Sequence, residues 1–429
     1  MWRFSYRLFH AVAAIIHWSN RRLTAAGMLV LSGVVITGAV GVDTTQSVAY
    51  QAFGLLLALI AASALCLPFL RVRVSAEREL PRVATAGEPF TYRLRVANLG
   101  ERPLDGLSIF EDLADPRPSL ETFRASVRFP TYRAWKRLVN AQRAAQVPEQ
   151  PLPELRPHAR TEIEVRARAL RRGTAHSDGL TVACADPLGL AKALARVPRR
   201  SNLIVLPRRY TLPPLNLPGS RRYQPGGVAL ATSVGDSEEF VGLRDYRPGD
   251  PLQRIHWKSF ARAARPIVKE YQDEYFERHA LVLDTFAAGR DERLFEEAVS
   301  IAASFAWTID TRECLLDLMF IGAEAHTYTA GRGQMQAGNL LEVLAGVQPC
   351  RDKPFSVLAN AVLSRRHALT GCICVLLGWD EARREFVRRL HSHGVASRVI
   401  AVCREPVADP PAWLLAVEPG KVQEALGKL

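Results

Sequence analysis

The sequence lacks the local motifs that mark several common catalytic sites. Its 429 residues contain no nucleophile-elbow, P-loop or HExxH pattern, so nothing local predicts a serine hydrolase, a P-loop nucleotide enzyme or a zinc protease. Residues 331–333 begin like a dinucleotide-binding loop, but Gln336 stands where the third glycine belongs. His391 and His393 are two residues apart at the end of a predicted helix, which favours surface or capping roles over metal binding. We therefore expect a protein without catalytic residues or cofactors.

Cysteines are few and unpatterned. The seven of them lie between Cys66 and Cys403 without a disulfide or CxxC framework, which fits a reducing compartment. Cys372 and Cys374 are two residues apart in an apolar run, so in a strand they point to the same face. Core packing is the favoured role for this pair.

Acidic residues are outnumbered by basic ones. The chain has 56 Lys and Arg against 43 Asp and Glu, a formal net charge of +13. No zinc-finger spacing or aromatic–basic signature accompanies the cations, so we expect no nucleic-acid partner. Membrane lipids are an expected partner, because anionic headgroups attract each juxtamembrane cation by roughly 1 kcal/mol. A basic protein that binds anionic lipid or nucleic acid as its main activity stays open as an alternative.

Charge is absent from two long runs near the N-terminus. Residues 23–42 and 44–70 contain no charged side chain, and each is long enough for a membrane-spanning helix. Arginines flank the pair on its outer sides, whereas the link around Asp43 has no cation. By the positive-inside rule we predict a cytoplasmic segment 1–22, a transmembrane hairpin 23–70 and both termini in the cytoplasm. The alternative, a signal peptide ending near Asn20, lacks a small-residue cleavage pattern.

The middle of the chain predicts a β-sandwich. Residues 72–206 contain short alternating segments bounded by Gly, Pro and Asn. An insertion at about 115–154 does not alternate and is expected to be helical or loose. Trp135, Lys136 and Arg137 could let it contact a membrane surface or a partner, although a variable insertion is the simpler interpretation. Prolines recur through 207–239, which favours an extended linker.

The C-terminal part, residues 279–429, predicts an α/β domain. Apolar strand-like runs alternate with helical patterns, as in a parallel sheet covered by helices. The predicted strands are HALVLD, CLLDLMFIG, GCICVLLGWD and SRVIAVC, and the predicted helices are ERLFEEAVSIAASFAWTID, NLLEVLAG, FSVLANAVLSRR and EARREFVRRLH. Ligand sites in such sheets lie at the carboxyl ends of the strands, which draws attention to Asp284 and Asp380.

Residues 240–278 lie between the linker and this domain, and we call them the signature segment. Asp250-Pro251 followed by Gln253 predicts a helix that starts at Asp250 with a capping box. Pro266 disfavours helical geometry at Arg265 and should end that helix.

The predicted helix has two distinct faces. Trp257 and Phe260 are expected to pack inward. The other face carries cations at helical spacing, namely Arg254, Lys258, Arg262 and Arg265. These cations form either a solvated basic surface or a docking surface for an acidic partner or anionic lipid headgroups.

The signature segment resembles the domain of unknown function 58 family. The matching residues are Phe240, Leu243, Arg244, Tyr246, Pro248, Gly249, Asp250, Arg254, Ile255, Trp257, Lys258, Ala261 and Arg262, with further echoes at Arg172-Gly173, at residues 186–190 and at Leu206-Pro207. The resemblance implies a bacterial membrane-anchored protein with an immunoglobulin-like region and a von Willebrand factor A-like domain, commonly working beside a MoxR-type AAA+ ATPase. It also implies a multi-pass protein of the cell inner membrane.

Von Willebrand A domains hold a divalent cation with Asp-x-Ser-x-Ser after the first strand. Here the corresponding run is residues 284–288, Asp-Thr-Phe-Ala-Ala, so both serine positions have lost their hydroxyl. Mg²⁺ prefers octahedral oxygen coordination, which Phe and Ala side chains cannot provide. We therefore predict no metal. Asp284 and Asp380 remain the candidates for the alternative function, a metal-dependent adhesion module or enzyme.

The leading prediction is a non-enzymatic scaffold that docks a MoxR-type AAA+ ATPase and takes part in protein complex assembly or maturation. The predicted docking residues are Arg244, Asp245, Arg247, Arg254, Lys258 and Arg262. The predicted structural residues of the segment are Tyr246, Pro248, Gly249, Asp250 and Trp257.

Overall fold

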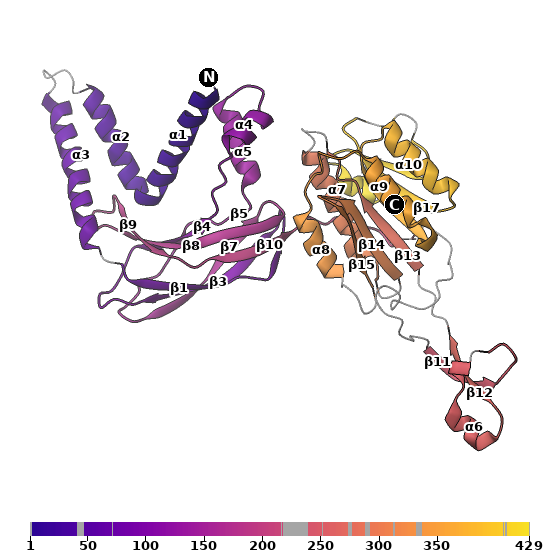
Figure 1. The fold of residues 1–429 in the computed structure, drawn as a ribbon. Helices are drawn as coiled ribbons and strands as arrows, with labels where there is room; N and C mark the ends of the chain where they lie inside the picture. Colours follow the sequence, from indigo (N-terminus) through magenta and orange to yellow (C-terminus); the bar gives the residue numbers. More distant parts are fainter. Residues whose placement is uncertain are drawn as a thin grey trace. The chain divides into compact units, whose positions relative to one another are not determined.

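The computed structural model of the chain divides into two compact units, Met1–Leu206 and Pro207–Leu429, which we describe separately (Figure 1). The residues described are 2–40, 47–70, 72–215, 217, 239–250, 252–272, 277–287, 292–311, 314–331, 337–405, 407 and 410–428. Several sequence predictions fall outside them. These are the link at Asp43, most of the proline-rich linker, Pro251, Ala288, and the glycine-containing loop up to Gln336.

The first unit begins with three helices, α1 (Trp2–Arg22), α2 (Ala25–Val40) and α3 (Ser47–Cys66), followed by a 3₁₀ turn, η1 (Leu67–Phe69). Val48–Phe69 is the stretch of the described residues that is long and apolar enough to cross a membrane, and α2 is apolar but shorter. The structure thus supports one candidate span where the sequence predicts two. Gly33 and Gly38 of α2 face Leu56 and Phe53 of α3, so these two helices pack side by side.

A β-sandwich follows the helices. One sheet has the order β1–β3–β7–β5, and the other β2–β10–β8–β4–β6 with β9 also paired to β8. In β3 and β7 alternate residues are buried or half-buried, because successive side chains point to opposite faces. The core between the sheets includes Leu94, Val96, Val165, Leu180 and Val182. The strands are β1 (Val74–Glu79), β2 (Val83–Thr85), β3 (Pro89–Asn98), β4 (Leu107–Leu113), β5 (Ala145–Gln146), β6 (Gln150–Pro151), β7 (Arg160–Ala169), β8 (Gly173–Ala185), β9 (Lys192–Val197) and β10 (Ser201–Leu206).

The insertion within the sandwich contains two helices, α4 (Leu120–Ser126) and α5 (Tyr132–Gln142). Each helix starts at a hydroxyl N-cap, where Ser119 accepts from the Thr122 amide and Thr131 from the Ala134 amide. The short strands β5 and β6 then return the chain to the two sheets. The helical form of the insertion agrees with the sequence prediction.

The second unit contains a six-stranded sheet of order β15–β14–β13–β16–β17–β18, parallel except for the edge strand β15. α9 and α10 cover the face that includes Val282, Cys374 and Val399, whereas α7 packs on β13, β16 and β17 from the other face. All four predicted strands and all four predicted helices are present. The elements are β13 (Glu277–Leu283), α7 (Glu292–Thr308), β14 (Cys314–Ile321), β15 (Ala325–Ala330), α8 (Ala337–Gly346), α9 (Ser356–Ser364), η4 (Arg366–Ala368), β16 (Gly371–Leu377), α10 (Glu381–Ser392), β17 (Ala396–Val402), β18 (Leu414–Val417) and α11 (Val422–Leu426).

The start of the predicted linker packs on this unit. The Tyr210 amide donates to Ser304 Oγ of α7 at 2.8 Å, and its hydroxyl donates to Glu297. The Thr211 amide donates to Gln423 Oε1 of α11 at 3.1 Å. These residues are therefore part of the α/β unit, and the prediction of a linker starting at residue 207 is wrong for them.

Candidate functional site

The signature segment forms a small structure of its own. Strand β11 (Glu239–Asp245) pairs antiparallel with β12 (Ile267–Gln272), and the connection between them contains η3 (Leu252–Arg254) and α6 (Trp257–Ala263). Ile255 bridges to Val268, and both side chains are buried. The His256 amide donates to the Ile267 carbonyl at 2.8 Å, which fixes the start of α6 against β12.

Asp250 organises the turn before this helix. Its carboxylate accepts from Arg244 Nη1 and Nη2 at 2.7 and 2.8 Å and from the Arg247 amide at 2.8 Å. The Arg244 hydrogen bonds, helped by the Arg247 amide, lower the pKa of Asp250 to about 2. The adjacent Gly249 has φ +107°, a conformation that other residues rarely adopt.

This geometry corrects the predicted start of the helix. The α-helix begins at Trp257, after His256, and not at Asp250, because the Asp250 carboxylate binds Arg244 and the Arg247 amide instead of capping a helix. Arg244, predicted as a docking residue, is paired with Asp250 in this turn. Asp250 keeps the structural role that was predicted for it, by a different contact.

The aromatic side chains of α6 point outward. Trp257 is 64% exposed and Phe260 37% exposed, so the prediction that they pack inward is wrong. Their rings meet edge to face with centroids 5.9 Å apart. The reason is the size of the segment: among its described side chains the buried ones are Ile255 and Val268, which leaves little interior to enclose two aromatic rings.

Two cations lie on the other face of α6. Lys258 and Arg262 lie one helical turn apart on α6 and are exposed. We call Trp257, Lys258, Phe260 and Arg262 the α6 surface. Of the other predicted residues, Arg247 and Arg254 are exposed on the preceding turn and on η3, and Asp245 pairs with Arg265 at 3.2 Å. Tyr246 donates its amide to the Pro266 carbonyl.

The strand-end aspartates, Asp284 and Asp380, meet at one arginine that sequence reasoning missed. Arg383 Nε lies 2.7 Å from Asp284 Oδ2, and its Nη1 lies 2.6 Å from Asp380 Oδ2. Asp284 follows β13, whereas Asp380 is the N-cap of α10 and accepts from the Arg383 amide at 3.0 Å. The one local signal for this arginine was its position three residues after the N-cap aspartate Asp380, which predicts a pair between these two residues but not the contact with Asp284.

These residues do not fit a divalent cation. Asp284 Oδ1 accepts from the Phe286 amide, and Oδ2 accepts from both the Leu377 amide and Arg383 Nε, so a cation already neutralises this carboxylate. Thr285 donates its hydroxyl to the Ile321 carbonyl. Complete burial raises the pKa of Asp284, and Arg383 with the two amides opposes that shift. Within the described residues, no cluster of His, Cys, Asp and Glu could hold a metal ion.

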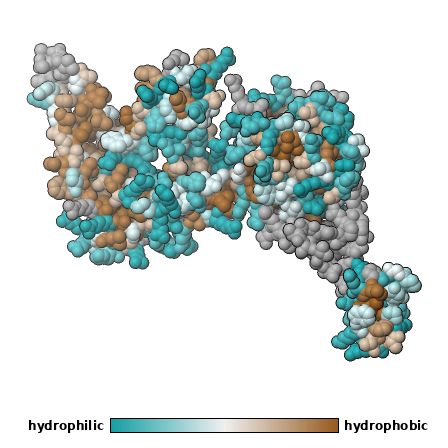
Figure 2. All heavy atoms as spheres, viewed as in Figure 1, coloured by the Kyte–Doolittle hydropathy of each residue, from teal (hydrophilic) through white to brown (hydrophobic). Residues whose placement is uncertain are grey.

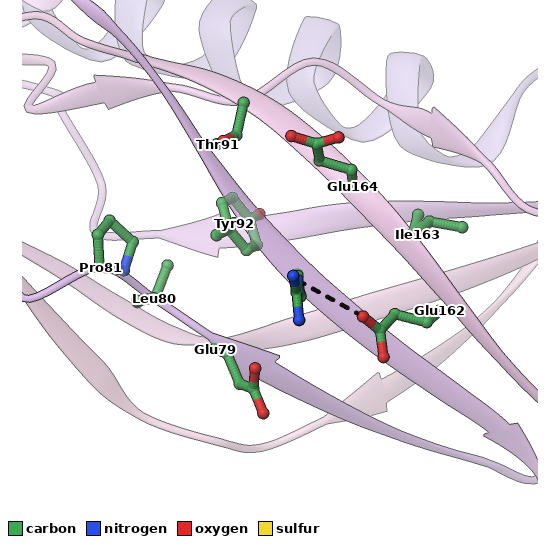
Figure 3. Close-up of a pocket in the computed structure, with 9 residues that line it drawn as sticks. Glu79, Leu80, Pro81, Thr91, Tyr92, Glu162, Ile163 and Glu164 are labelled. Atoms are coloured by element: carbon green, nitrogen blue, oxygen red, sulfur yellow. Dashed lines mark ion pairs between the residues drawn. The ribbon is translucent and has the colours of Figure 1, made fainter.

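A hollow on the surface of the sandwich is also lined by charged side chains, but these side chains belong to a solvated face of the sheet. It is lined by residues of β1, β3 and β7 and has a volume of 770 Å³ (Figure 3). Of its lining residues, Arg93 lies 3.7 Å from Glu162, and the neighbouring Arg95 pairs with the lining residues Glu79 at 2.7 Å and Glu162 at 2.8 Å. Such cross-strand pairs stabilise the sheet face and leave no converging polar groups for a ligand.

Comparisons with known proteins locate the matched region. Residues 242–411 match the family model described as "Protein of unknown function DUF58". The "Uncharacterized protein YeaD" of Bacillus subtilis is 26% identical over 198 residues, which is 45% of this chain and 48% of that protein. The chain thus spans about half the length of the curated relative it matches.

Solved structures show only a distant likeness. Salmonella alpha-2-macroglobulin reacted with methylamine is 20% identical, covering 40% of this chain and 9% of that one, with a TM-score of 0.19. The FixG-related protein from Vibrio parahaemolyticus is 12% identical, covering 31% and 95%, with a TM-score of 0.18. At these TM-scores the likeness carries no functional argument.

Proposed function

Because the chain belongs to the DUF58 family through residues 242–411, we propose that it is a membrane-anchored, non-enzymatic scaffold that docks a MoxR-type AAA+ ATPase. The observation that carries the proposal is the α6 surface, where the short helix exposes Trp257 and Phe260 on one face and Lys258 and Arg262 on the other. Exposed aromatic residues and arginine are enriched at protein interfaces, and the charge of Lys258 and Arg262 would favour an acidic partner. The scaffold would take part in the assembly or maturation of a protein complex.

The α/β domain of this scaffold is von Willebrand factor A-like in our proposal. Its mostly parallel sheet with helices on both faces supports that assignment. Arg383 supports a domain that works by recognition, because its guanidinium lies against both strand-end aspartates, where the alternative metal-dependent function needs a cation.

Anchoring in the cell inner membrane is the third part of the proposal. α3 supplies the candidate span, and its close contact with α2 at Gly33 and Gly38 supports a two-helix hairpin. Arg21 and Arg22 before the hairpin and Arg73 after it support cytoplasmic locations for both ends.

The docking proposal is tested by co-purification from detergent-solubilised membranes, with and without ATP. In the full-length chain, Lys258→Glu with Arg262→Glu should reduce the recovered ATPase by about tenfold or more, because two attractive charges become repulsive. The matched control, Arg365→Glu with Arg389→Glu, makes the same charge change on exposed sites of the α/β domain and should leave recovery unchanged.

An unchanged yield of ATPase with the α6 double variant contradicts the docking surface. Equal losses in both double variants would instead indicate a nonspecific effect of net charge. Thermal unfolding of each variant separates lost docking from lost folding, since all four side chains are exposed.

A further inference from the structure

Helix α1 exposes an apolar stripe along its length. Phe4, Leu8, Ile15 and Trp18 recur at spacings of four, seven and three residues, so they share one face of the helix. Their exposed fractions are 73%, 48%, 65% and 56%. Isolated exposed apolar residues need no explanation, but a continuous stripe marks a surface that contacts something apolar.

The opposite face of α1 is already covered by the insertion. Tyr6 and Phe9 pack on Trp135 with ring centroids 5.4 and 6.3 Å apart, and both rings also contact the buried Phe123. The aromatic cluster fixes α1, α4 and α5 as one structural element. The insertion helices therefore do not cover the exposed stripe, because they already pack on the other face of α1.

This element is strongly basic. Residues 119–143 contain one acidic residue, Glu121, and six cations that are all exposed: Arg124, Arg128, Arg133, Lys136, Arg137 and Arg143. Phe129, between the two insertion helices, is 66% exposed and lies under the Arg128 guanidinium at 5.7 Å. Exposed aromatic residues among cations are typical of helices that lie in a membrane interface.

The position of the element brings it to the proposed membrane. Only Leu23 and Thr24 separate α1 from α2, and within the first unit all five helices stand on the same side of the sandwich (Figure 1). In Figure 2 the apolar surface is most extensive over α2 and α3, and it continues in patches among polar residues over α1, α4 and α5.

We propose that α1, α4 and α5 form a second, peripheral membrane contact that binds anionic phospholipid headgroups while the α1 stripe enters the bilayer interface. The inference rests on the proposed membrane anchoring by α2 and α3. Lipid is favoured over a second copy of this chain, because a symmetric contact would bring the six cations of each copy together. An anionic bilayer offers negative headgroups to the cations and an apolar interior to the stripe.

The test uses the full-length chain in lipid nanodiscs. An environment-sensitive fluorescent amino acid replaces Phe129 in one sample and Leu57 of α3 in another, and lipids with brominated acyl chains serve as quenchers. We expect the probe at position 129 to be quenched at least about twofold more in nanodiscs containing phosphatidylglycerol than in phosphatidylcholine alone. The probe at position 57 should be quenched in both.

Charge reversal supplies the matched comparison. Arg124→Glu, Arg128→Glu and Lys136→Glu together should remove the extra quenching at position 129. The control triple variant, Arg102→Glu, Arg156→Glu and Arg166→Glu, changes the net charge equally on exposed sandwich positions and should retain it.

The outcomes separate the inference from the anchoring on which it depends. An unquenched probe at position 129 together with a quenched probe at position 57 overturns the peripheral contact and leaves the span in place. An unquenched probe at position 57 refutes the span itself. Equal quenching at position 129 in the insertion triple variant overturns the role of the cations.

Discussion

At the scale of single residues, Arg383 is the counter-ion of the two aspartates at the strand ends of the α/β domain. Its guanidinium is buried and contacts Asp284, which is completely buried, and Asp380, which is largely exposed. A buried carboxylate without a partner is very unfavourable, so the arginine and the two backbone amides make the charge of Asp284 tolerable.

Arg383→Met should therefore lower the free energy of unfolding by about 3–5 kcal/mol, because it leaves Asp284 buried without its counter-ion. Chemical denaturation of the detergent-solubilised protein measures the change. The matched control is Arg384→Met, at an exposed neighbour 3.8 Å from Glu381, which should cost less than about 1 kcal/mol. Adding Asp284→Ala to Arg383→Met should restore part of the loss; a further loss would contradict this explanation.

We expect the turn at Asp250 in the signature segment to lose stability in acid. Its pKa is about 2 in the folded chain against 3.8 for the ordinary group. A lowered pKa contributes stability that is present above about pH 4 and is lost as the pH falls through about 2. Protection of the Arg247 amide against hydrogen exchange, corrected for the intrinsic rate, should fall over that range.

In Asp250→Asn this acid dependence should disappear, and protection should already be low at neutral pH. Asp245→Asn is the control, because Asp245 pairs with Arg265 and accepts no hydrogen bond from the Arg247 amide. Unchanged acid dependence in Asp250→Asn would rule out this carboxylate as its source.

At the scale of elements, the loop at residues 186–190 connects the helices to the sandwich. Asp186 Oδ1 accepts from the Leu190 and Ala191 amides at 2.7 and 2.9 Å, which directs loop carbonyls toward the start of α2. The Thr24 amide donates to the Leu190 carbonyl at 3.0 Å, and Gly27 packs directly on that carbonyl. The loop thus has a docking role that its sequence did not reveal.

Gly27→Val should weaken this connection, because a Cβ at position 27 would overlap the Leu190 carbonyl oxygen. We expect a loss of about 1–3 kcal/mol in the free energy of unfolding of the first unit, with faster hydrogen exchange at residues 186–191. Gly54→Val in α3 is the control, since a Cβ there meets no atom within 4 Å. Equal effects of the two substitutions would show that helix substitution in general, and not the loop contact, is responsible.

At the scale of the whole molecule, the number of membrane crossings decides on which side each end lies. Two crossings place both ends on the cytoplasmic side, whereas a single crossing by α3 places them on opposite sides. We expect two crossings, because the short helix α2 packs on α3 and has Arg21 and Arg22 before it but no Lys or Arg in the link after it.

Fusions to each end test this topology. A fluorescent protein that matures only in the cytoplasm should fluoresce at either terminus, and alkaline phosphatase should stay inactive at either terminus. An active phosphatase at the N-terminus alone would contradict the second crossing and leave α3 as the only span of the hairpin region.

The sequence by itself determined the elements whose character is local. The strands β13, β14, β16 and β17 are buried on both faces, so their apolar runs identify them without knowledge of their neighbours. The sandwich was identified by another local pattern. Apolar and polar residues alternate along strands that have one buried and one solvated face. The turn at Gly249 and the absence of hydroxyl oxygens at the two serine positions, residues 286 and 288, are likewise local properties.

Only the tertiary structure decided which distant groups meet. Asp284 and Arg383 are 99 positions apart, and their pairing depends on β13 and α10 reaching the same sheet edge. Trp257 is exposed because the signature segment is too small to cover it, whereas Trp135 is buried because α1 supplies the missing face of the insertion. Burial is a property of what surrounds a side chain, and that depends on how distant parts of the chain pack together.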